Sequence, residues 1–274
     1  MKLRPDLTGV PETMLWTLHN RASEAKKPKG LIRDPEAVRI YEALDYDYER
    51  FFGKAEGSHA VRAVEMDAVL RAWLVRHPDG YIVSLGEGLE TQFSRIDNGR
   101  LQWLSVDLPD SMALREKFLP AGPRCRHFAG SALDRTWLDL VTAEHQRSGD
   151  DLFIVAQGLF MYLPVEETRQ LLVDITSRLP GAEILFDTVP RWFSRLTLRG
   201  YKRTRYYQTP AMPWGIDCNE IAPTLSRWHI SRETRTWTYS MPRGLPRLIG
   251  IAFKMHPTLR HQLPAITHAV LRPC

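Results

Sequence analysis

Apolar runs of strand length alternate with helical stretches through the middle of the chain, and this alternation limits the possible folds more than any other feature. The runs are YIVSL (81–85), LQWLSV (101–106), CRHFAG (125–130), DLFIVA (151–156) and AEILFD (182–187). The stretches between them carry apolar residues at helical spacing, most clearly in VEETRQLLVDITSRL (165–179). Such alternation predicts a mostly parallel sheet with helices on both faces, a Rossmann-like α/β fold.

The alternation stops after the fifth run. Residues 188–226 are aromatic, basic and punctuated by prolines, and we interpret them as a substrate lid inserted over the carboxyl edge of the sheet. Strands are predicted again at 233–239 and 247–253, with one last short strand at 268–272. These strands would form an antiparallel C-terminal end of the sheet.

The N-terminal residues 1–57 are polar and interrupted by prolines, which indicates a cap segment ahead of the sheet. One helix is predicted within it at 35–44, where Asp34 can act as the N-cap. A second helix is expected over 59–73. The length suits one large α/β domain, so we expect residues 1–274 to form a single domain with a cap and a lid.

Composition and charge argue against several classes of function. The net charge of +5 comes from scattered basic residues, so we expect a solvated surface and no nucleic-acid partner. No apolar run has the length of a membrane span or of a signal-peptide core. Three widely spaced cysteines match no zinc motif. We therefore expect a cytoplasmic protein that has no metal and no membrane partner, while its oligomeric state stays open.

Polar and glycine residues follow the predicted strands at the point where each strand ends. Gly86 and Gly88 follow the first strand, and Asp107 ends the second. Residues 131–134 (SALD) and 157–158 (Gln-Gly) follow the third and fourth strands, and Asp187 ends the fifth. Each alone is commonly a turn or a helix cap. Because the carboxyl ends of parallel strands share one edge, together they predict a ligand site there.

The glycine turn itself indicates which ligand to expect. The third glycine of a G-x-G-x-x-G dinucleotide motif is absent, because Thr91 stands in its place. A pyrophosphate would therefore lose its close seat at the helix N-terminus. This favours a nucleoside cofactor without a pyrophosphate, such as S-adenosyl-L-methionine (SAM), over NAD.

Taken together, these motifs resemble a known family. SLGEGLETQFSRI (84–96) followed by WLSVDLPDSMALREKFLP (103–120) is similar to the signature of the leucine carboxyl methyltransferase family of class I SAM-dependent O-methyltransferases. The branch of this family that contains the O-methyltransferase of tetracenomycin polyketide synthesis shares four further motifs. These are GLIRDPEA (30–37), SALDRTW (131–137), QGLFMYLP (157–164) and WGID (214–217). The resemblance runs in order along nearly the whole chain.

The resemblance implies roles for individual residues. Gly86 and Gly88 would line the methionine part of SAM, and Asp107 would hold its ribose. Arg62 lies five residues before Asp67, matching an R-x-x-x-x-D helix whose arginine pairs with the SAM carboxylate. The cofactor-binding residues predicted in this way are Arg62, Gly86, Glu87, Gly88, Asp107, Leu108, Ser131, Ala132, Leu133, Asp134 and Gln157. The alternative for Arg62 is an ordinary solvated arginine on the face of the helix.

The chain also departs from the family pattern. The family carboxylate at the start of EGLxMYLP is Gln157 here, and the small residue between the two glycines is Glu87. Gln157 keeps a hydrogen-bonding amide but loses a negative charge near the cofactor's ammonium or sulfonium. We hypothesise that Glu87 restores this charge.

The resemblance implies O-methylation of a small molecule, aromatic or polyketide-like, at a carboxylate or a hydroxyl. A carboxylate acceptor needs no general base, whereas a phenol benefits from one, and no base stands out in the sequence. Tyr162 is predicted to face the methyl-transfer region, although it could equally be a core aromatic. Predicted acceptor-binding residues are Tyr162, Arg199, Tyr206 and Trp214. Two alternatives remain, a methyltransferase of protein C-terminal carboxylates and a SAM-binding protein that does not methylate.

Overall fold

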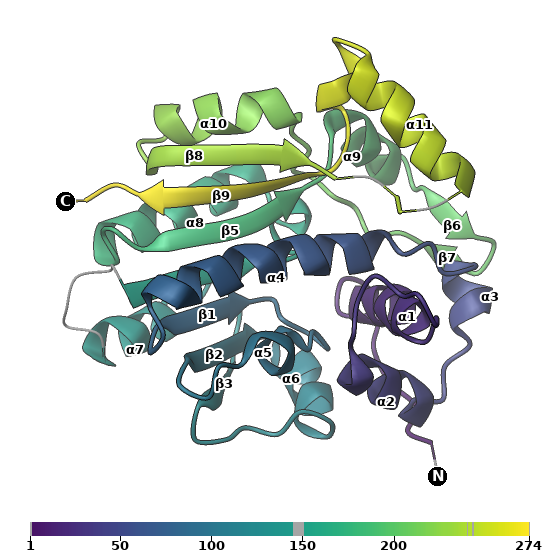
Figure 1. Cartoon of the computed structure of the whole chain (residues 1–274), viewed down its shortest axis with the longest axis horizontal. Coiled ribbons are helices and arrows are strands. Elements are labelled where there is room, and N and C mark those ends of the chain that lie inside the picture. Colours follow the sequence, from purple (N-terminus) through teal and green to yellow (C-terminus); the bar gives the residue numbers. More distant parts are fainter. Residues whose placement is uncertain (1, 145–150, 240, 243, 274) are drawn as a thin grey trace.

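A computed structural model describes residues 2–144, 151–239, 241–242 and 244–273 of the chain. Its centre is a seven-stranded sheet of order β3-β2-β1-β4-β5-β9-β8 (Figure 1). β3, β2, β1, β4 and β5 are parallel, and β9 and β8 run antiparallel beside β5. The predicted α/β class, mostly parallel with an antiparallel C-terminal end, is confirmed.

The strand bounds follow the predicted runs closely for the parallel part of the sheet. The strands are β1 (Tyr81–Leu85), β2 (Gln102–Asp107), β3 (Cys125–Ala129), β4 (Leu152–Ala156), β5 (Glu183–Thr188), β6 (Lys202–Thr204), β7 (Tyr207–Gln208), β8 (Ser231–Thr238) and β9 (Ala265–Leu271). The helices are α1 (Thr13–Ala25), α2 (Pro35–Ala43), α3 (Tyr48–Phe52), α4 (Ser58–Arg76), α5 (Gln92–Ile96), α6 (Pro109–Glu116), α7 (Thr136–Glu144), α8 (Val165–Arg178), α9 (Arg191–Leu198), α10 (Cys218–Arg227) and α11 (Gly244–Met255).

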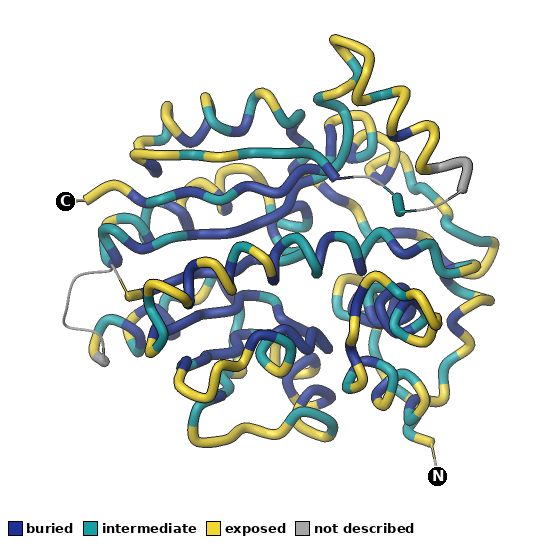
Figure 2. Tube along the Cα trace, in the orientation of Figure 1, coloured by how far each residue is buried: buried dark blue, intermediate teal, exposed yellow. Residues whose placement is uncertain are grey.

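Side chains of the buried strands alternate between two apolar cores, one on each face of the sheet. Val83 and Ile154 point to the core that α7, α8 and α10 cover. Ile82 and Phe153 point to the opposite core, which α4 and α5 cover. Figure 2 shows the central strands buried along their length. The continuous apolar runs of the sequence are therefore explained by burial on both faces.

The N-terminal residues form a third core beside the glycine turn. α1, α2 and α3 bury Leu18, Ile40 and Phe52 together, and Leu89 of the turn after β1 joins them. Asp34 caps α2 as predicted, because its carboxylate accepts from the backbone N–H of Ala37 at 3.0 Å. α1 was not predicted from the sequence. It lies beside α4 and over the end of the sheet (Figure 1).

One predicted strand is wrong. Residues 247–253 lie in α11, and the place beside β5 belongs to β9, which is longer than the predicted strand at 268–272. A short apolar run cannot be assigned to a strand or a helix by periodicity alone. Here Leu248 and Ile251 remain 63% and 41% exposed, which a strand inside this sheet would not allow.

The 188–226 segment divides into two structural parts. α9 and the β6–β7 hairpin lie towards the carboxyl edge of the sheet, whereas α10 packs Ile221 and Leu225 into the core of the sheet. The single domain with an N-terminal cap and a lid stays a prediction. Within the described ranges, no helix is long and apolar enough to cross a membrane.

Candidate functional site

A cavity of about 630 Å³ opens at the carboxyl edge of the parallel strands. It receives residues that directly follow or end β1, β2, β3, β4 and β5, together with residues of α1, α4, α9 and α11. Of the predicted cofactor-binding residues, those in the lining are Arg62, Gly86, Glu87, Gly88, Asp107, Leu108, Ser131, Ala132, Leu133 and Gln157. The volume is in the range of small-molecule and cofactor sites.

The backbone of the glycine turn lines this cavity in a conformation that residues with a Cβ rarely adopt. Gly86 has φ +64° and Gly88 has φ +52°. A Cβ on Gly86 would lie 2.9 Å from Leu159 Cδ1, and one on Gly88 would lie 2.9 Å from Met14 Cβ. Both glycines are required by conformation and by space.

Asp107 ends β2 and is held against the glycine turn. Its carboxylate accepts from the N–H of Gly88 at 2.5 Å and from the N–H of Leu108 at 2.7 Å. Burial raises the pKa of Asp107, although these two N–H groups oppose the rise. The carboxylate is thereby placed at the cavity wall, where it suits a ligand that presents hydroxyl donors.

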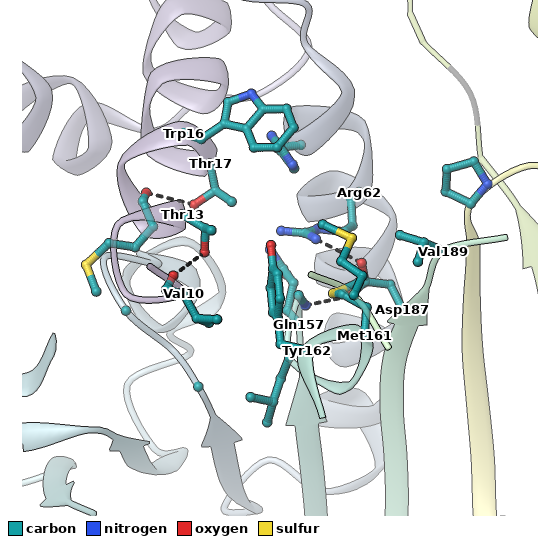
Figure 3. Close-up of a pocket in the computed structure, with 18 of the residues that line it drawn as sticks. Val10, Thr13, Trp16, Thr17, Arg62, Gln157, Met161, Tyr162, Asp187 and Val189 are labelled. Carbon is teal, nitrogen blue, oxygen red and sulfur yellow. Dashed lines mark hydrogen bonds and ion pairs between the residues drawn. The ribbon is translucent and has the colours of Figure 1, made fainter. Parts of the chain in front are cut away.

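Arg62 of α4 and Asp187 of β5 form a buried ion pair at the cavity wall (Figure 3). Arg62 Nη1 donates to Asp187 Oδ2 at 2.8 Å, and the N–H of Gly158 donates to Asp187 Oδ1 at 2.6 Å. The Nε of Arg62 is buried and has no hydrogen-bond partner among the described residues. A guanidinium with an unused donor fits the carboxylate of an amino-acid-like cofactor.

Gln157 follows β4 and connects the cavity to a network of buried charges. Its Nε2 donates to Glu90 Oε2 at 2.9 Å, while its Oε1 is buried without a partner in the described structure. This oxygen fits an ammonium group, which donates hydrogen bonds only. Two orphaned polar atoms, Arg62 Nε and Gln157 Oε1, therefore match the two ends of an α-amino acid.

The hypothesis that Glu87 compensates for Gln157 is not supported by the geometry. The Glu87 carboxylate is buried and accepts from Trp103 Nε1 and from Arg115 Nη2, each at 3.0 Å. Burial raises its pKa, and Arg115 opposes the rise. Glu87 therefore contributes backbone to the cavity wall, and the carboxylate that contacts Gln157 is Glu90.

Glu90 belongs to an ion-pair network that the sequence did not indicate. Arg21 of α1 and Arg95 of α5 each approach its carboxylate to 2.6 Å. Arg95 also pairs with Asp34 at 3.0 Å and with Asp67 at 2.7 Å. Burial opposes ionisation of Glu90, but the two guanidinium groups outweigh it and lower the pKa to about 2. The network ties the N-terminal helices to the glycine turn.

Four predicted site residues do not line the cavity, so their roles stay predictions that this geometry does not support. Asp134 is exposed, and its carboxylate accepts from the N–H of Thr136 at the start of α7. Arg199 is exposed at the end of α9. Tyr206 is 42% exposed, with Arg205 over its ring at 4.5 Å. Trp214 is a core residue, packed against Phe160 and Phe186.

Tyr162 is the predicted acceptor residue that does line the cavity. Its ring stands between α1 and Arg62, with the hydroxyl directed towards Thr13 (Figure 3). Burial raises the pKa of Tyr162 to about 12, so the phenol is protonated near neutral pH and can donate a hydrogen bond. Further aromatic residues that were not selected as site residues also line the cavity. They are Trp16 on α1, Trp192 and Phe193 on α9, Tyr239 after β8, and Phe253 on α11.

Every carboxylate in the described cavity wall is already engaged. Glu56 pairs with Arg203 at 3.0 Å. The other four, Glu87, Glu90, Asp107 and Asp187, bind arginines or backbone N–H groups. Within the described part of the chain, no group of three His, Cys, Asp or Glu side chains is placed to hold a metal ion. The described cavity wall therefore holds no carboxylate without a hydrogen-bond or ion-pair partner.

Known proteins resemble this chain in sequence and in fold. A family model described as leucine carboxyl methyltransferase matches residues 14–176, which include the glycine turn and β1 to β4. The tetracenomycin polyketide synthesis O-methyltransferase TcmP of Streptomyces glaucescens is 30% identical, over 97% of each chain. A candidate SAM-dependent methyltransferase of a Parafrankia species is 30% identical over 65% of this chain and 63% of its own. The solved structure of a candidate methyltransferase from Thermobifida fusca YX superposes with a TM-score of 0.55, at 13% identity, over 98% of this chain and 96% of its own.

Proposed function

Because the chain belongs to the leucine carboxyl methyltransferase family, we propose that it methylates the carboxylate of a small aromatic or polyketide-like acid. SAM is the cofactor of this methyltransferase. When bound, SAM supplies a methyl group that an oxygen lone pair attacks, while the sulfonium sulfur leaves as a neutral thioether. The contribution of the protein is to align the acceptor oxygen and to exclude water.

The orphaned donors and acceptors of the cavity wall would hold the cofactor. Arg62 would bind the carboxylate of SAM, and the free Oε1 of Gln157 would accept from its ammonium. Asp107 would accept from the ribose hydroxyls, and residues 131–133 would line the adenine. The positive-φ backbone at Gly86 and Gly88 would let the methionine part approach closely.

The proposal of a carboxylate acceptor rests on the hydrogen bonds and ion pairs that the carboxylates of the cavity wall already make. All of them are paired with arginines or backbone N–H groups, so none is available to take a proton from a substrate hydroxyl. Burial raises the pKa of Tyr162 to about 12, so its phenol keeps its proton near neutral pH. A carboxylic acid has lost its proton at neutral pH, whereas a phenol, with a pKa of about 10, has not. A cavity whose described carboxylates are all engaged therefore favours the acid.

The acceptor end of the cavity supports a small planar molecule. Trp192 and Phe193 of α9 and Phe253 of α11 supply apolar surface to the cavity. Arg203 also lines the cavity, where it lies over the ring of Trp16 and pairs with Glu56. Aromatic side chains bind planar ligands by stacking and edge contacts. The name of the relative TcmP refers to a polyketide, and its similarity over nearly the whole chain supports an acceptor of this kind.

Transfer of a labelled methyl group tests the proposal. The enzyme is incubated with methyl-labelled SAM and a panel of aromatic carboxylic acids, phenols and peptides with a free C-terminus. The expected products are methyl esters of the acids, which release labelled methanol in mild alkali. Label that enters only phenols in an alkali-stable form, only peptides, or no acceptor at all would contradict the proposal.

A further inference from the structure

His59 is a polar group of the cavity wall to which the proposed chemistry gives no role. It lies in the first turn of α4 and lines the cavity together with Ser58 and Arg62. Its ring packs edge-on against Trp16, with centroids 5.3 Å apart and planes at 87°. A histidine in a transferase site is commonly a general base, so the position of its proton decides what it can do.

Asn20 fixes that position. Asn20 Nδ2 lies 2.7 Å from His59 Nδ1, and Asn20 Oδ1 accepts from the backbone N–H of Glu56 at 3.1 Å. A backbone N–H can only donate, so the amide must present its oxygen to Glu56 and its NH₂ to His59. Because an NH₂ group also only donates, Nδ1 of His59 must be the acceptor. Asn20 is 1% exposed, which leaves it little freedom to turn.

The surroundings keep the ring neutral. Burial lowers the pKa of His59 well below its usual value, and Arg62 of α4, Arg21 of α1 and Arg203 of β6 lower it further. Glu90, after β1, acts in the opposite direction. A neutral ring whose Nδ1 accepts must carry its hydrogen on Nε2. No described residue accepts from Nε2, and this nitrogen is not fully buried, so a ligand can reach it.

We propose that His59 is a fixed hydrogen-bond donor, whose Nε2–H binds one oxygen of the methyl acceptor, and that Asn20 is the positioning residue that prevents it from acting as a base. The inference rests on the proposed function, and it defines the acceptor further. A carboxylate has two oxygens, so one can accept from His59 while the other attacks the methyl carbon. A phenol has a single oxygen and cannot do both equally well. His59 thus selects for acids.

The tautomer can be read directly from the full-length protein labelled with ¹⁵N-histidine. Nine histidines contribute signals, and His59→Gln identifies those of residue 59. We expect the ring nitrogens of His59 to report the neutral form with hydrogen on Nε2. Addition of S-adenosylhomocysteine and 2-naphthoate should shift the Nε2 signal more than the Nδ1 signal. An Nδ1–H form, a charged ring, or an Nε2 signal that does not respond would overturn the assignment.

Asn20→Asp tests the positioning role. Aspartate can still accept from Glu56, but its other oxygen accepts from His59, which should move the hydrogen to Nδ1 or charge the ring. The pH profile of kcat/KM should then acquire an ionisation that the wild type lacks. An Asn20→Asp variant with the wild-type tautomer and the wild-type pH profile would contradict this role.

Kinetics with a carboxylate acceptor distinguish the loss of the His59 hydrogen bond from a loss of packing by its ring. His59→Phe keeps a planar ring without a donor, and kcat/KM for 2-naphthoate should fall roughly tenfold to a hundredfold. His59→Gln keeps an N–H near the Nε2 position and should recover much of the loss. The affinity for SAM should change little in both variants, as in the matched control His77→Gln at the far end of α4. Unchanged turnover by a folded His59→Phe enzyme would overturn the proposal.

Failure of the wild type to methylate any acid would instead contradict the proposed function, and the tautomer measurement would still decide the assignment of His59.

Discussion

Gln157 donates its side-chain amide to the carboxylate of Glu90 across 2.9 Å, where the cavity meets the buried ion-pair network. The residue that replaces the family carboxylate at position 157 is thus bound to another carboxylate, which Arg21 and Arg95 keep ionised. The negative charge near the cofactor's expected ammonium therefore comes from Glu90. Gln157 lies between Glu90 and the cavity: its amide nitrogen donates to Glu90, and its amide oxygen has no partner among the described residues.

Gln157→Glu is expected to destabilise the protein, because it places a second carboxylate within hydrogen-bond distance of Glu90. The free energy of unfolding at pH 7 should fall by about 1 to 3 kcal/mol. Adding Glu90→Gln, which exchanges the two groups, should recover a large part of the loss. Adding Glu87→Gln should not, because Glu87 faces Arg115. Urea unfolding of the single and double variants measures both couplings, and a larger coupling to Glu87 would contradict the geometry.

Arg62→Lys should weaken SAM binding roughly tenfold to a hundredfold. A lysine keeps the positive charge, but it lacks the planar fork that can bind Asp187 and a cofactor carboxylate at the same time. Isothermal titration with SAM measures the loss. Arg76→Lys, at the exposed end of the same helix, is the control and should bind normally. Equal affinity of wild type and Arg62→Lys would remove Arg62 from the cofactor site.

Acid should destabilise the protein through Glu90. Its folded pKa, about 2, lies below the unfolded value of about 4.5, so the ionised group contributes stability above pH 4.5. That contribution, on the order of 3 kcal/mol, should be lost as the pH falls from about 4.5 to 2. Urea unfolding as a function of pH should show a steeper loss in wild type than in Glu90→Gln. Parallel curves for the two proteins would contradict the pKa shift of Glu90.

Trp192→Ala should raise the KM for an aromatic acceptor roughly tenfold and leave SAM affinity unchanged. Trp192 lines the cavity from α9, and its Nε1 donates to the carbonyl of Gln262 beyond α11 at 2.9 Å. The substitution removes aromatic surface and the hydrogen bond that links α9 to the segment after α11. Leu198→Ala, exposed on the same helix and outside the cavity, is the control. A similar KM in both variants would exclude Trp192 from acceptor binding.

The parallel half of the fold could be predicted from the sequence because its signals are local. Strands buried on both faces read as continuous apolar runs, and each run from 81–85 to 182–187 became a strand within one or two residues. The run at 247–253 failed because a short apolar segment suits a strand and a helix equally. Only the pairing of β9 with β5 and β8 decides between them, and that is a property of the assembled sheet.

The position of the residues proposed for the cofactor end was predictable for the same reason, since most of them follow strands that the sequence locates. The acceptor end was not, because it is assembled from helices whose placement depends on tertiary contacts. Arg199 and Tyr206 have suitable chemistry but lie on the solvent side of their segment, and Trp214 is needed in the core. Arg21 and Asn20 carried no motif. Their roles follow from the packing of α1 against α4 and the glycine turn.

The pH dependence of methyl transfer to a matched pair of acceptors, 2-naphthoate and 2-naphthol, tests the central claim most directly. The acid is already ionised and no cavity base titrates, so kcat/KM for 2-naphthoate should be flat between about pH 6 and 9. The rate with 2-naphthol should be much lower and rise with pH as the phenol itself ionises. The account predicts an alkali-labile ester and a preference for the acid of at least about a hundredfold at pH 7. A preference for the naphthol, with an ionisation of the enzyme near neutral pH, would contradict it.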